Sequence, residues 1–564
     1  MNIKLPRLGQ YLALAFAGIT MTAQFAQAQT TPDNRPVVRV AVQQISNSGA
    51  LDPLREQSNV GTRVLPMIYA GLIELDTTGD LKPKAGIAES WKRIDDRTLE
   101  FKLRPGVKFH NGDPVTVEDI AFSFSPQRMF GQTKPNTGAT VAAGAASTKP
   151  AVATTAKPAA ANDPAFATGP TPPPEVVAVA RNIWPSLIGV EIIDDKTVRL
   201  VNALPDVTLE GRLARLGSEI ISKKAYLAAK DWNTWAQQPI SAGPFKVKEL
   251  KQDQSLVLVA NDDYFGGKPN VREIRYTVVP EVSSRINGLI SGQYDFVTDI
   301  PPDQFKLIQN NPKFEITGGP VLNHRLVVFD KTNAILANPK IRQAMTHAID
   351  RKAIVDALWA GKTSIPAGLQ WEYYGDMYIK DWEVPKYDPA LAKKLLKEAG
   401  YKGEPIPFRT MNNYYTNQTQ TDQIMLEMWK AVGMNVQMQM AENWSQIFEK
   451  GPTRGVRGWS NSAPFSDPVS SMVNQHGPKG QQQRMGEWSN DEFNKLSDVL
   501  MTSVNPQERR ETFARMLVIA EREDPAYTVL HRTAVFYAKR KDFEWKPSQT
   551  FLMDFRADNL QPPK

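Results

Sequence analysis

The sequence of 564 residues contains no cysteine. This absence excludes disulfide bonds, a thiol nucleophile and a thiolate metal site, so we expect the fold to depend on packing alone. It also excludes the lipid-modified cysteine that tethers many exported proteins to a membrane. We therefore expect a soluble protein rather than a tethered lipoprotein.

Histidine is scarce, with five residues in the chain, and their spacing does not match that of metal ligands. They are His110, His324, His347, His476 and His531. The phosphate-binding loop, the dinucleotide fingerprint, the zinc-protease motif and the nucleophile elbow are also missing. The sequence therefore predicts no metal site, no cofactor and no catalytic constellation, which disfavours a secreted hydrolase.

No apolar run reaches the roughly 20 residues that a membrane-spanning helix needs. The apolar run at 11–19 is instead typical of a signal peptide, because Lys4 and Arg7 precede it and Ala-Gln-Ala follows at 26–28. We predict that residues 1–28 are removed on export. Losing their two cations lowers the net charge from +7 to +5, a mild excess that gives no reason to expect nucleic acid as a partner.

Residues 132–174 are rich in Ala, Thr, Pro and Gly and contain almost no large apolar side chain. Such a segment buries too little surface to offset the entropy that is lost on ordering. We predict a disordered insertion on the surface of a small domain, and a partner-binding tail is the alternative interpretation.

The most informative stretch is residues 87–124. Apolar and charged residues alternate over Leu99–Leu103, which is the pattern of a half-buried strand. Thr116 lies three residues before Asp119, and this spacing predicts a capping box at the start of a helix.

This stretch closely resembles the signature of the family 5 extracytoplasmic solute-binding proteins, which load ligands onto ABC importers. Further segments resemble blocks of that family in the expected order along the chain. They are 64–75 (VLPMIYAGLIEL), 240–245 (ISAGPF), 261–270 (NDDYFGGKPN), 291–296 (SGQYDF), 341–357 (IRQAMTHAIDRKAIVDA) and 387–401 (YDPALAKKLLKEAGY).

The resemblance implies an α/β fold of the periplasmic-binding-protein type II class, with two lobes, two crossovers and an extra small domain. The implied limits are about 29–70, 186–315 and 525–564 for lobe I, about 71–185 for the extra domain with its insertion, and about 316–524 for lobe II.

Residue patterns also predict individual elements. Strands are expected at 37–42, 196–201, 255–260 and 273–279. One helix is expected from an N-cap at Asn338 to Trp359, a second from Asp388-Pro389 to Gly400, and a third over about 421–433.

The resemblance places the ligand site in lobe II, where peptide-binding relatives hold peptide termini with an aspartate and an arginine. Ser462, three residues after Trp459, stands where the aspartate would be. Asn412 stands where the arginine would be. Both charges are absent, and because a buried charge needs an opposite partner, ordinary dipeptides are disfavoured.

The neutral and aromatic residues that are left suit a sugar, an opine or an amide-rich ligand. The candidate ligand-binding residues are Trp459, Trp444, Tyr414, Asn412, Ser462, Asn461 and Asp467. In the family, the residue at the position of Asp467 more often fixes the turn before the following proline. Arg454 and Arg457 are expected in a solvated loop, with capture of an anion as the alternative, and the basic run 539–541 is expected on a solvated face.

The resemblance implies a periplasmic receptor that captures a small ligand of the peptide, opine or oligosaccharide class between its lobes. As a monomer without a cofactor, it would deliver that ligand to the permease subunits of an ABC importer. A chaperone-like or sensory periplasmic binder that serves no transporter is the alternative. Nickel or haem binding is a minor option. The scattered histidines argue against direct metal ligation but leave binding of a chelate open.

Overall fold

The computed structural model describes residues 33–131 and 169–563. The predicted signal peptide and most of the predicted insertion therefore lie outside the described residues. The described residues from 35 onward belong to one compact unit, and the following account concerns that unit.

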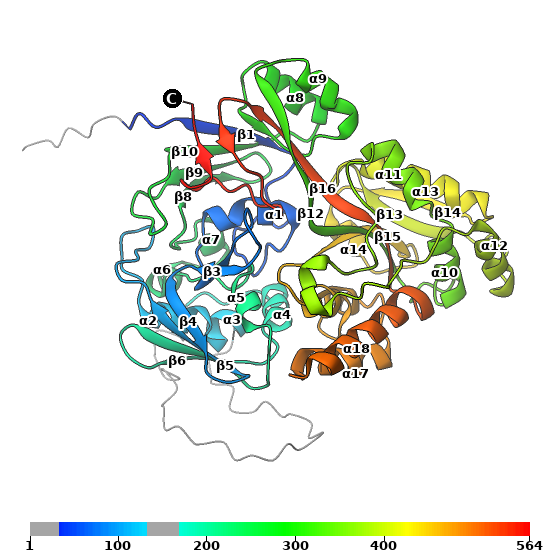
Figure 1. Ribbon diagram of the computed structural model, residues 1–564, viewed down its shortest axis with the longest axis horizontal. Helices are drawn as coiled ribbons and strands as arrows, with labels where there is room; N and C mark the ends of the chain where they lie inside the picture. The colour runs from blue at the N-terminus through cyan, green and yellow to red at the C-terminus, as the bar shows by residue number, and fades with distance from the viewer. Residues whose placement is uncertain (1–32, 132–168, 564) are drawn as a thin grey trace, which may run out of the picture. The chain divides into compact units, whose positions relative to one another are not determined.

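A ten-stranded mixed sheet is the main feature of this unit (Figure 1). In their order across the sheet, its strands are β14 (Val436–Ala441), β13 (Ile406–Met411), β15 (Val456–Ser462), β12 (Phe314–Phe329), β16 (Tyr527–Arg540), β11 (Phe296–Val297), β1 (Val37–Val42), β10 (Glu273–Val278), β9 (Ser255–Ala260) and β8 (Phe245–Lys251). We call the part that contains β1 and β8–β11 the first half, and the part that contains β13–β15 the second half.

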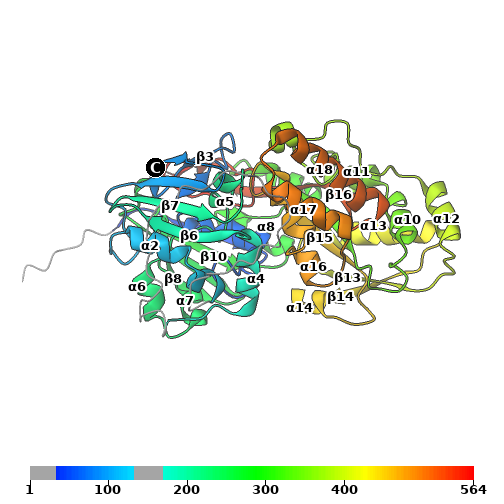
Figure 2. The ribbon, with the colours of Figure 1, turned by 90° about the horizontal axis from the view of Figure 1, so that it is seen from below.

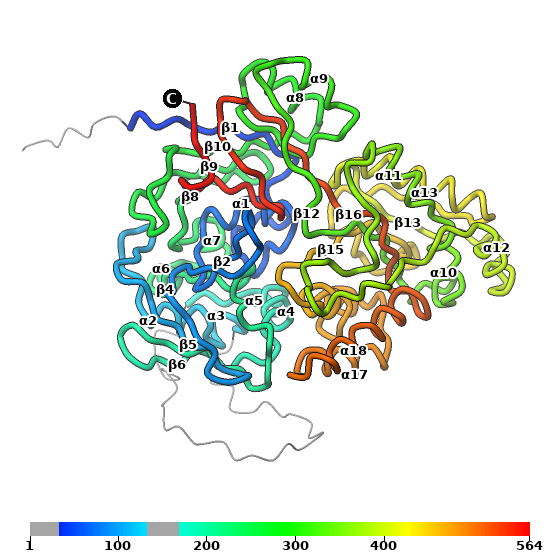
Figure 3. Tube along the Cα trace, viewed as in Figure 1, coloured from blue at the N-terminus to red at the C-terminus, as the bar shows by residue number. Residues whose placement is uncertain are grey.

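Two long antiparallel strands, β12 and β16, connect these halves. They have 16 and 14 residues and lie side by side (Figures 1 and 3). The chain enters the second half through β12 and returns through β16. Their pairing is irregular between Pro320 and His324 and again between Arg325 and Leu326. Bulges of this kind bend a strand, so a bend between the halves is built into this connection.

The apolar core is divided in the same way. One cluster in the first half contains Val40 and Tyr276 together with Trp545 from the end of the chain. Two other clusters contain Phe513 and Trp429 and belong to the second half. Each half thus has a hydrophobic core of its own.

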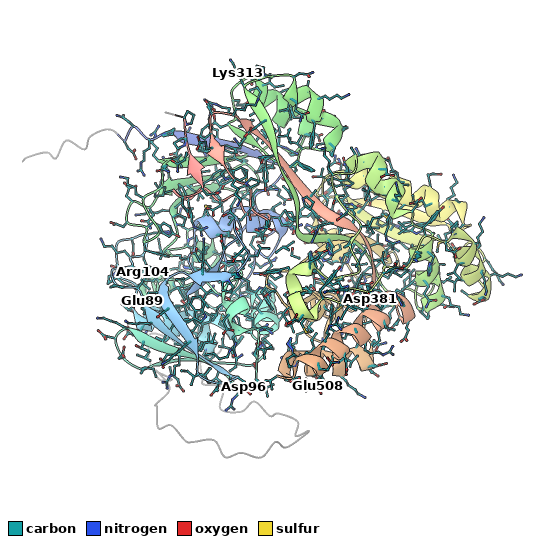
Figure 4. The ribbon with its side chains drawn as sticks, viewed as in Figure 1. Glu89, Asp96, Arg104, Lys313, Asp381 and Glu508 are labelled. Carbon is teal, nitrogen blue, oxygen red and sulfur yellow. The ribbon has the colours of Figure 1, made fainter. Side chains whose placement is uncertain are left out.

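The stretch 87–124 supplies two strands of a four-stranded antiparallel sheet in the first half, together with a helix. The strands of this sheet are β4 (Ala88–Arg93), β5 (Thr98–Leu103), β7 (Thr197–Asn202) and β6 (Leu187–Ile192), with helix α2 (Val117–Ser123) beside them (Figure 2). Leu99 is fully buried, and Asp96 lies at the outer end of this sheet (Figure 4). Thr116 and Asp119 cap α2 reciprocally, so both the predicted strand and the predicted capping box are confirmed.

The two short sheets and the remaining helices complete the fold. The sheets pair β2 (Ile73–Leu75) with β3 (Pro83–Ala85) and β17 (Glu544–Trp545) with β18 (Leu560–Gln561). The helices outside the predicted ranges are α1 (Asn59–Val64), α3 (Pro126–Phe130), α4 (Pro174–Ile183), α5 (Leu209–Leu213), α6 (Lys223–Ala228), α7 (Trp232–Gln237), α8 (Val282–Ile290), α9 (Phe305–Gln309), α14 (Trp444–Phe448), α15 (Met472–His476), α16 (Gln481–Arg484), α17 (Asp491–Thr502) and α18 (Pro506–Val518). Among the described residues, no helix has the length and apolar character that crossing a membrane requires.

The predicted strands are all present, with one or both ends shifted by a residue in β7 and β10. The single helix predicted from Asn338 to Trp359 is wrong, because the structure contains two helices, α10 (Pro339–His347) and α11 (Arg351–Trp359). The side chain of Asp350 accepts a hydrogen bond from the Ala353 amide at 3.0 Å and starts the second helix.

The other two helix predictions are confirmed. Helix α12 (Pro389–Glu398) begins at the predicted cap, where Asp388 accepts a hydrogen bond from the Leu391 amide at 2.8 Å. Helix α13 (Gln418–Ala431) begins three residues before the predicted start at 421.

The C-terminal limit of the predicted insertion is wrong. Pro170 is buried, and its carbonyl accepts a hydrogen bond from the Tyr226 hydroxyl at 3.1 Å. Pro174 is already the first residue of α4. The chain is therefore packed against the first half from about residue 169.

Three cations that the sequence placed on solvated surfaces are buried instead. Arg454 donates to Asp330 in the second half. Arg457 forms two hydrogen bonds of 2.7 Å with the Glu487 carboxylate, and Lys539 lies within β16 with 2% of its surface exposed. Those predictions are wrong because the carboxylates that neutralise the two arginines are distant in the sequence.

Candidate functional site

A cavity of about 190 Å³ is lined by residues from both halves of the molecule. The first half contributes Tyr69, Phe551 and the segment 213–219, which follows α5. The second half contributes residues 462–464, at the end of β15. A water molecule needs about 10–15 Å³, so the cavity has room for a small organic molecule.

Four charged side chains line this cavity, two of each sign: Glu74, Arg215, Glu219 and Arg556. Arg556 and Glu74 form an ion pair at 3.3 Å. A carboxylate oxygen of Glu219 accepts a hydrogen bond from the Gly217 amide at 2.8 Å, and burial raises the pKa of Glu219 to about 7. The cavity therefore combines a mainly apolar lining with four charged side chains.

Local structure holds the segment 213–219 in place. Glu219 forms an isolated bridge with Gly71, next to β2. Gly217 has a φ of +98°, and a Cβ atom there would lie 2.6 Å from Ile183, so the turn requires glycine. This turn brings Arg215 and Glu219 to the wall of the same cavity.

The predicted aromatic residues form a cluster of their own. The ring centroids of Trp444 and Tyr414 are 5.0 Å apart and those of Trp444 and Trp459 are 4.9 Å apart, both edge to face. The Arg457 guanidinium lies over the Trp459 ring at 4.6 Å. Much of the aromatic surface is therefore used in packing and in cation–π contact.

Two hydrogen bonds near this cluster join the halves. Asn47 Nδ2 donates to the Tyr414 hydroxyl at 3.0 Å, and Asn59 Nδ2 donates to Ser460 Oγ at 3.1 Å. Tyr414 and Asn59 also line a second cavity of about 20 Å³, which has room for little more than one water molecule. The halves are thus in contact on this side of the larger cavity.

The predicted polar residues have different positions. Ser462 lines the larger cavity and accepts a hydrogen bond from Asn323 Nδ2 at 2.8 Å. Asn461 is buried and donates to the Ser471 carbonyl at 3.3 Å. Asn412 is exposed and accepts from Thr419 Oγ1 at 3.1 Å. Of the seven predicted binding residues, Ser462 alone lines the larger cavity.

Asp467 is occupied by neighbouring groups. Both of its carboxylate oxygens accept hydrogen bonds from Arg509 Nη2, at 2.9 and 2.8 Å, and the Val469 amide donates to Oδ1 at 2.9 Å. Burial raises the pKa of Asp467, while Arg509 opposes that rise. These contacts fix the turn at Pro468 and leave this carboxylate little capacity for a ligand.

We expect the substitution Asp467→Asn to distinguish a role in fixing the turn from a role in binding the ligand. The variant should lose about 1.5–3 kcal/mol of unfolding free energy, because a hydrogen bond to a charged partner is weakened and Arg509 loses its anion. Ligand affinity, measured by calorimetry on the folded variant, should change less than twofold. Urea unfolding measures the first quantity, and unchanged stability with lost binding would assign Asp467 to the ligand site instead.

The charged residues of the cavity were not among those predicted from the sequence. Arg215 and Glu219 lie in a mainly apolar segment, LARLGSEII at 213–221, and charges in such a segment were the available signal. Glu74 and Arg556 are 482 positions apart in the sequence, and nothing in the sequence itself links them. In the part of the chain that the structure describes, no three His, Asp or Glu side chains are placed to hold a metal ion.

Comparison with known proteins identifies a family and a relative of similar sequence. The sequence model for "Bacterial extracellular solute-binding proteins, family 5 Middle" matches residues 82–482. Heme-binding protein A of Haemophilus influenzae is 26% identical over 495 residues, which cover 82% of this chain and 81% of that protein.

Two solved structures share the fold. The periplasmic protein DppA of Helicobacter pylori, in complex with the peptide STSA, has a TM-score of 0.78 at 19% identity, covering 94% of this chain and 99% of that one. AgaA of A. tumefaciens R10, in complex with agropinic acid, has a TM-score of 0.73 at 22% identity, with coverages of 94% and 99%. The expected two-lobed α/β fold is confirmed by these likenesses.

Proposed function

The chain belongs to family 5 of the bacterial extracellular solute-binding proteins, and on that basis we propose that it receives a small ligand for an ABC importer. Members of this family are extracytoplasmic binding proteins rather than enzymes. The ligand is of the peptide, opine or oligosaccharide class, and it is held between the two halves. Beside the family, the one structural observation that carries this proposal is the cavity of about 190 Å³, whose walls come from both halves.

Ligand capture follows from this arrangement. A ligand that contacts both walls binds the closed form more tightly than an open form, and only such differential affinity shifts the equilibrium toward closure. The hydrogen bonds from Asn47 to Tyr414 and from Asn59 to Ser460 form when the halves meet. The irregular stretches of β12 and β16 allow the bend. The closed shape is then what the permease recognises.

The domain limits are part of the same proposal. Lobe I comprises about 29–70, 186–315 and 525–564, lobe II about 316–524, and the extra domain about 71–185. The separate hydrophobic cores of the two halves support the division between lobe II and the rest, whereas the proposed extra domain shares its core with lobe I. We further propose export by the signal peptide 1–28 and action as a monomer in the periplasm, without enzymatic activity.

Calorimetry with a panel of peptides, opines and oligosaccharides tests the receptor function. We expect saturable binding of one class and no turnover of the ligand during prolonged incubation. Mass spectrometry of ligand that copurifies with the native protein identifies the class independently. Tight binding of ordinary dipeptides would overturn the preference for other ligands, and steady ligand breakdown would favour the hydrolase alternative.

The substitution Tyr414→Phe tests closure directly. It removes the hydroxyl that accepts from Asn47 across the halves. One hydrogen bond contributes about 0.5–1.5 kcal/mol, so we expect ligand affinity to fall about two- to tenfold. The matched control is Tyr401→Phe, which removes a hydroxyl that donates to Glu404 within the second half. Equal affinities of the two variants would show that this contact does not contribute to closure.

A further inference from the structure

Arg215 differs from the other arginine on its segment. Arg212 is neutralised by Asp206 at 2.6 Å and also donates to the Ile183 carbonyl at 2.8 Å. Arg215 donates from Nη2 to Gln57 Oε1 at 2.8 Å, but its Nε and Nη1 atoms are buried without a hydrogen-bond partner. Nε and Nη1 carry three of the five N–H donors of a guanidinium, so most of its donors are unused on the wall of the cavity.

Arg215 also lacks an ion-pair partner among the described residues. Burial and the nearby Arg212 lower the pKa of Arg215 to about 10, which still leaves the guanidinium protonated at neutral pH. In the described part of the chain, Arg215 forms no ion pair with a carboxylate. The side chain is half-buried, with Nε and Nη1 fully buried. Desolvating a charge without a partner has a cost, and an anion entering the cavity would supply that partner.

Glu219 does not fill this role. Its charge raises the pKa of Arg215, but one of its oxygens already accepts from the Gly217 amide. Because burial raises the pKa of Glu219 to about 7, a good part of its population is neutral at physiological pH. Glu219 therefore neutralises Arg215 only in part.

A second unused group lines the same cavity. Glu74 pairs with Arg556 through Oε2, while its Oε1 is buried without a hydrogen-bond partner. An unused acceptor and an unused cation on the walls of one cavity complement a ligand that has both a donor, such as an amine, and an anionic group. A neutral sugar would leave the guanidinium unpaired.

We propose that Arg215 binds a carboxylate of the ligand, so that the cargo is an organic acid with an amine or another donor group. Acidic opines and peptides with a free carboxyl fit this description, whereas neutral oligosaccharides do not. The proposal rests on the receptor function proposed above. It places the recognition of the acid on the first half of the molecule. The two positions at which peptide-binding relatives carry a charge, those of Asn412 and Ser462 here, both lie in the second half.

Calorimetry with matched probes tests the proposal. The probes are trialanine, glutathione, mannopinic acid, agropinic acid and maltotriose, and each one that binds is measured again as its carboxamide or methyl ester. We expect every binding probe to be an acid and its neutral derivative to bind at least tenfold more weakly. In Arg215→Met, the acid should lose the same factor, while the neutral derivative should bind as it does to the wild-type protein.

Two further variants make the result specific. Arg215→Lys keeps the charge but not the planar donors, and it should recover part of the lost affinity. Arg97→Met, at an exposed turn, should bind like the wild-type protein. Binding that is insensitive to Arg215, or tight binding of maltotriose, overturns this inference and leaves the receptor function intact. Failure of every probe to bind any folded variant contradicts the proposed receptor function itself for these ligand classes.

Discussion

Replacement of Arg457 with methionine is expected to lower the free energy of unfolding by about 3–5 kcal/mol. The Arg457 side chain is 4% exposed and its partner Glu487 is 1% exposed. Removing the cation leaves a carboxylate buried without its two charge-assisted hydrogen bonds. Urea unfolding followed by tryptophan fluorescence measures the loss, because Trp459 lies under the same guanidinium.

Two comparisons show whether burial causes this effect. The double variant Arg457→Met, Glu487→Leu removes both charges and should recover much of the stability. Arg515→Met removes an arginine that is 36% exposed and pairs with Glu492, and it should cost less than about 1 kcal/mol. If Arg457→Met costs no more than Arg515→Met, the solvated loop that the sequence indicated is the better description.

A second large effect is expected on acidification. Two of the four histidines that are buried in the described chain, His110 and His476, should together remove about 4 kcal/mol of unfolding free energy between pH 7 and pH 5, at about 1.4 kcal/mol per pKa unit. Burial lowers the pKa of His110 to about 4 and that of His476 to about 3, from an ordinary value of 6.5. Below pH 6.5 the unfolded chain binds protons at these histidines and the folded protein does not. The free energy of unfolding that they contribute above pH 6.5 is therefore lost as the pH falls.

Burial with a single hydrogen-bond partner accounts for the low pKa values, because desolvation lowers the pKa of each ring more than its one hydrogen bond raises it. His476 Nδ1 contacts Gln482 Oε1 at 2.6 Å, and His110 Nε2 contacts the Gly243 carbonyl at 3.2 Å. The other ring nitrogen of each histidine is buried without a partner. A second proton on either ring would therefore be a buried donor with no acceptor.

The double variant His110→Gln, His476→Asn isolates this contribution. Its amides can donate from the positions of the bonded ring nitrogens without titrating. Its loss of stability between pH 7 and pH 5 should be about 4 kcal/mol smaller than that of the wild-type protein. The comparison is needed because other groups also change stability in this range. His324 and His531, whose pKa values burial lowers to about 3 and about 4, act in the same direction. Glu219 and Asp422, whose pKa values burial raises to about 7 and about 6, act in the opposite direction. Parallel pH profiles for the two proteins would contradict the assignment.

The successes of the sequence analysis come from local interactions. The capping box of Thr116 and Asp119 and the helix cap at Asp388 are set by residues within three positions. The failures have a different cause. Arg457 finds Glu487 30 positions away, and Asp467 finds Arg509 42 positions away, and no short pattern shows whether such partners will meet.

The candidate site shows the same limit. The family resemblance led to the end of β15, and Ser462 does line the larger cavity. It gave no information about which neighbouring side chains are free, and Trp459 and Trp444 proved to be packed against each other. Arg215 lies in none of the family blocks. It is of interest because no carboxylate pairs with it in the described part of the chain, and only the fold shows that absence.

The hydrophobic core of the first half contains residues from both ends of the chain, and this has a consequence for biosynthesis. Phe296 packs edge to face against both Trp545 and Phe555, with ring centroids 5.5 and 5.4 Å apart, and β11 pairs with β16. A ribosome must therefore complete nearly the whole polypeptide before the half that contains β1 can close its core. The second half is continuous between β12 and β16, so it can fold first while the first half waits, with apolar surface that a holding chaperone would cover.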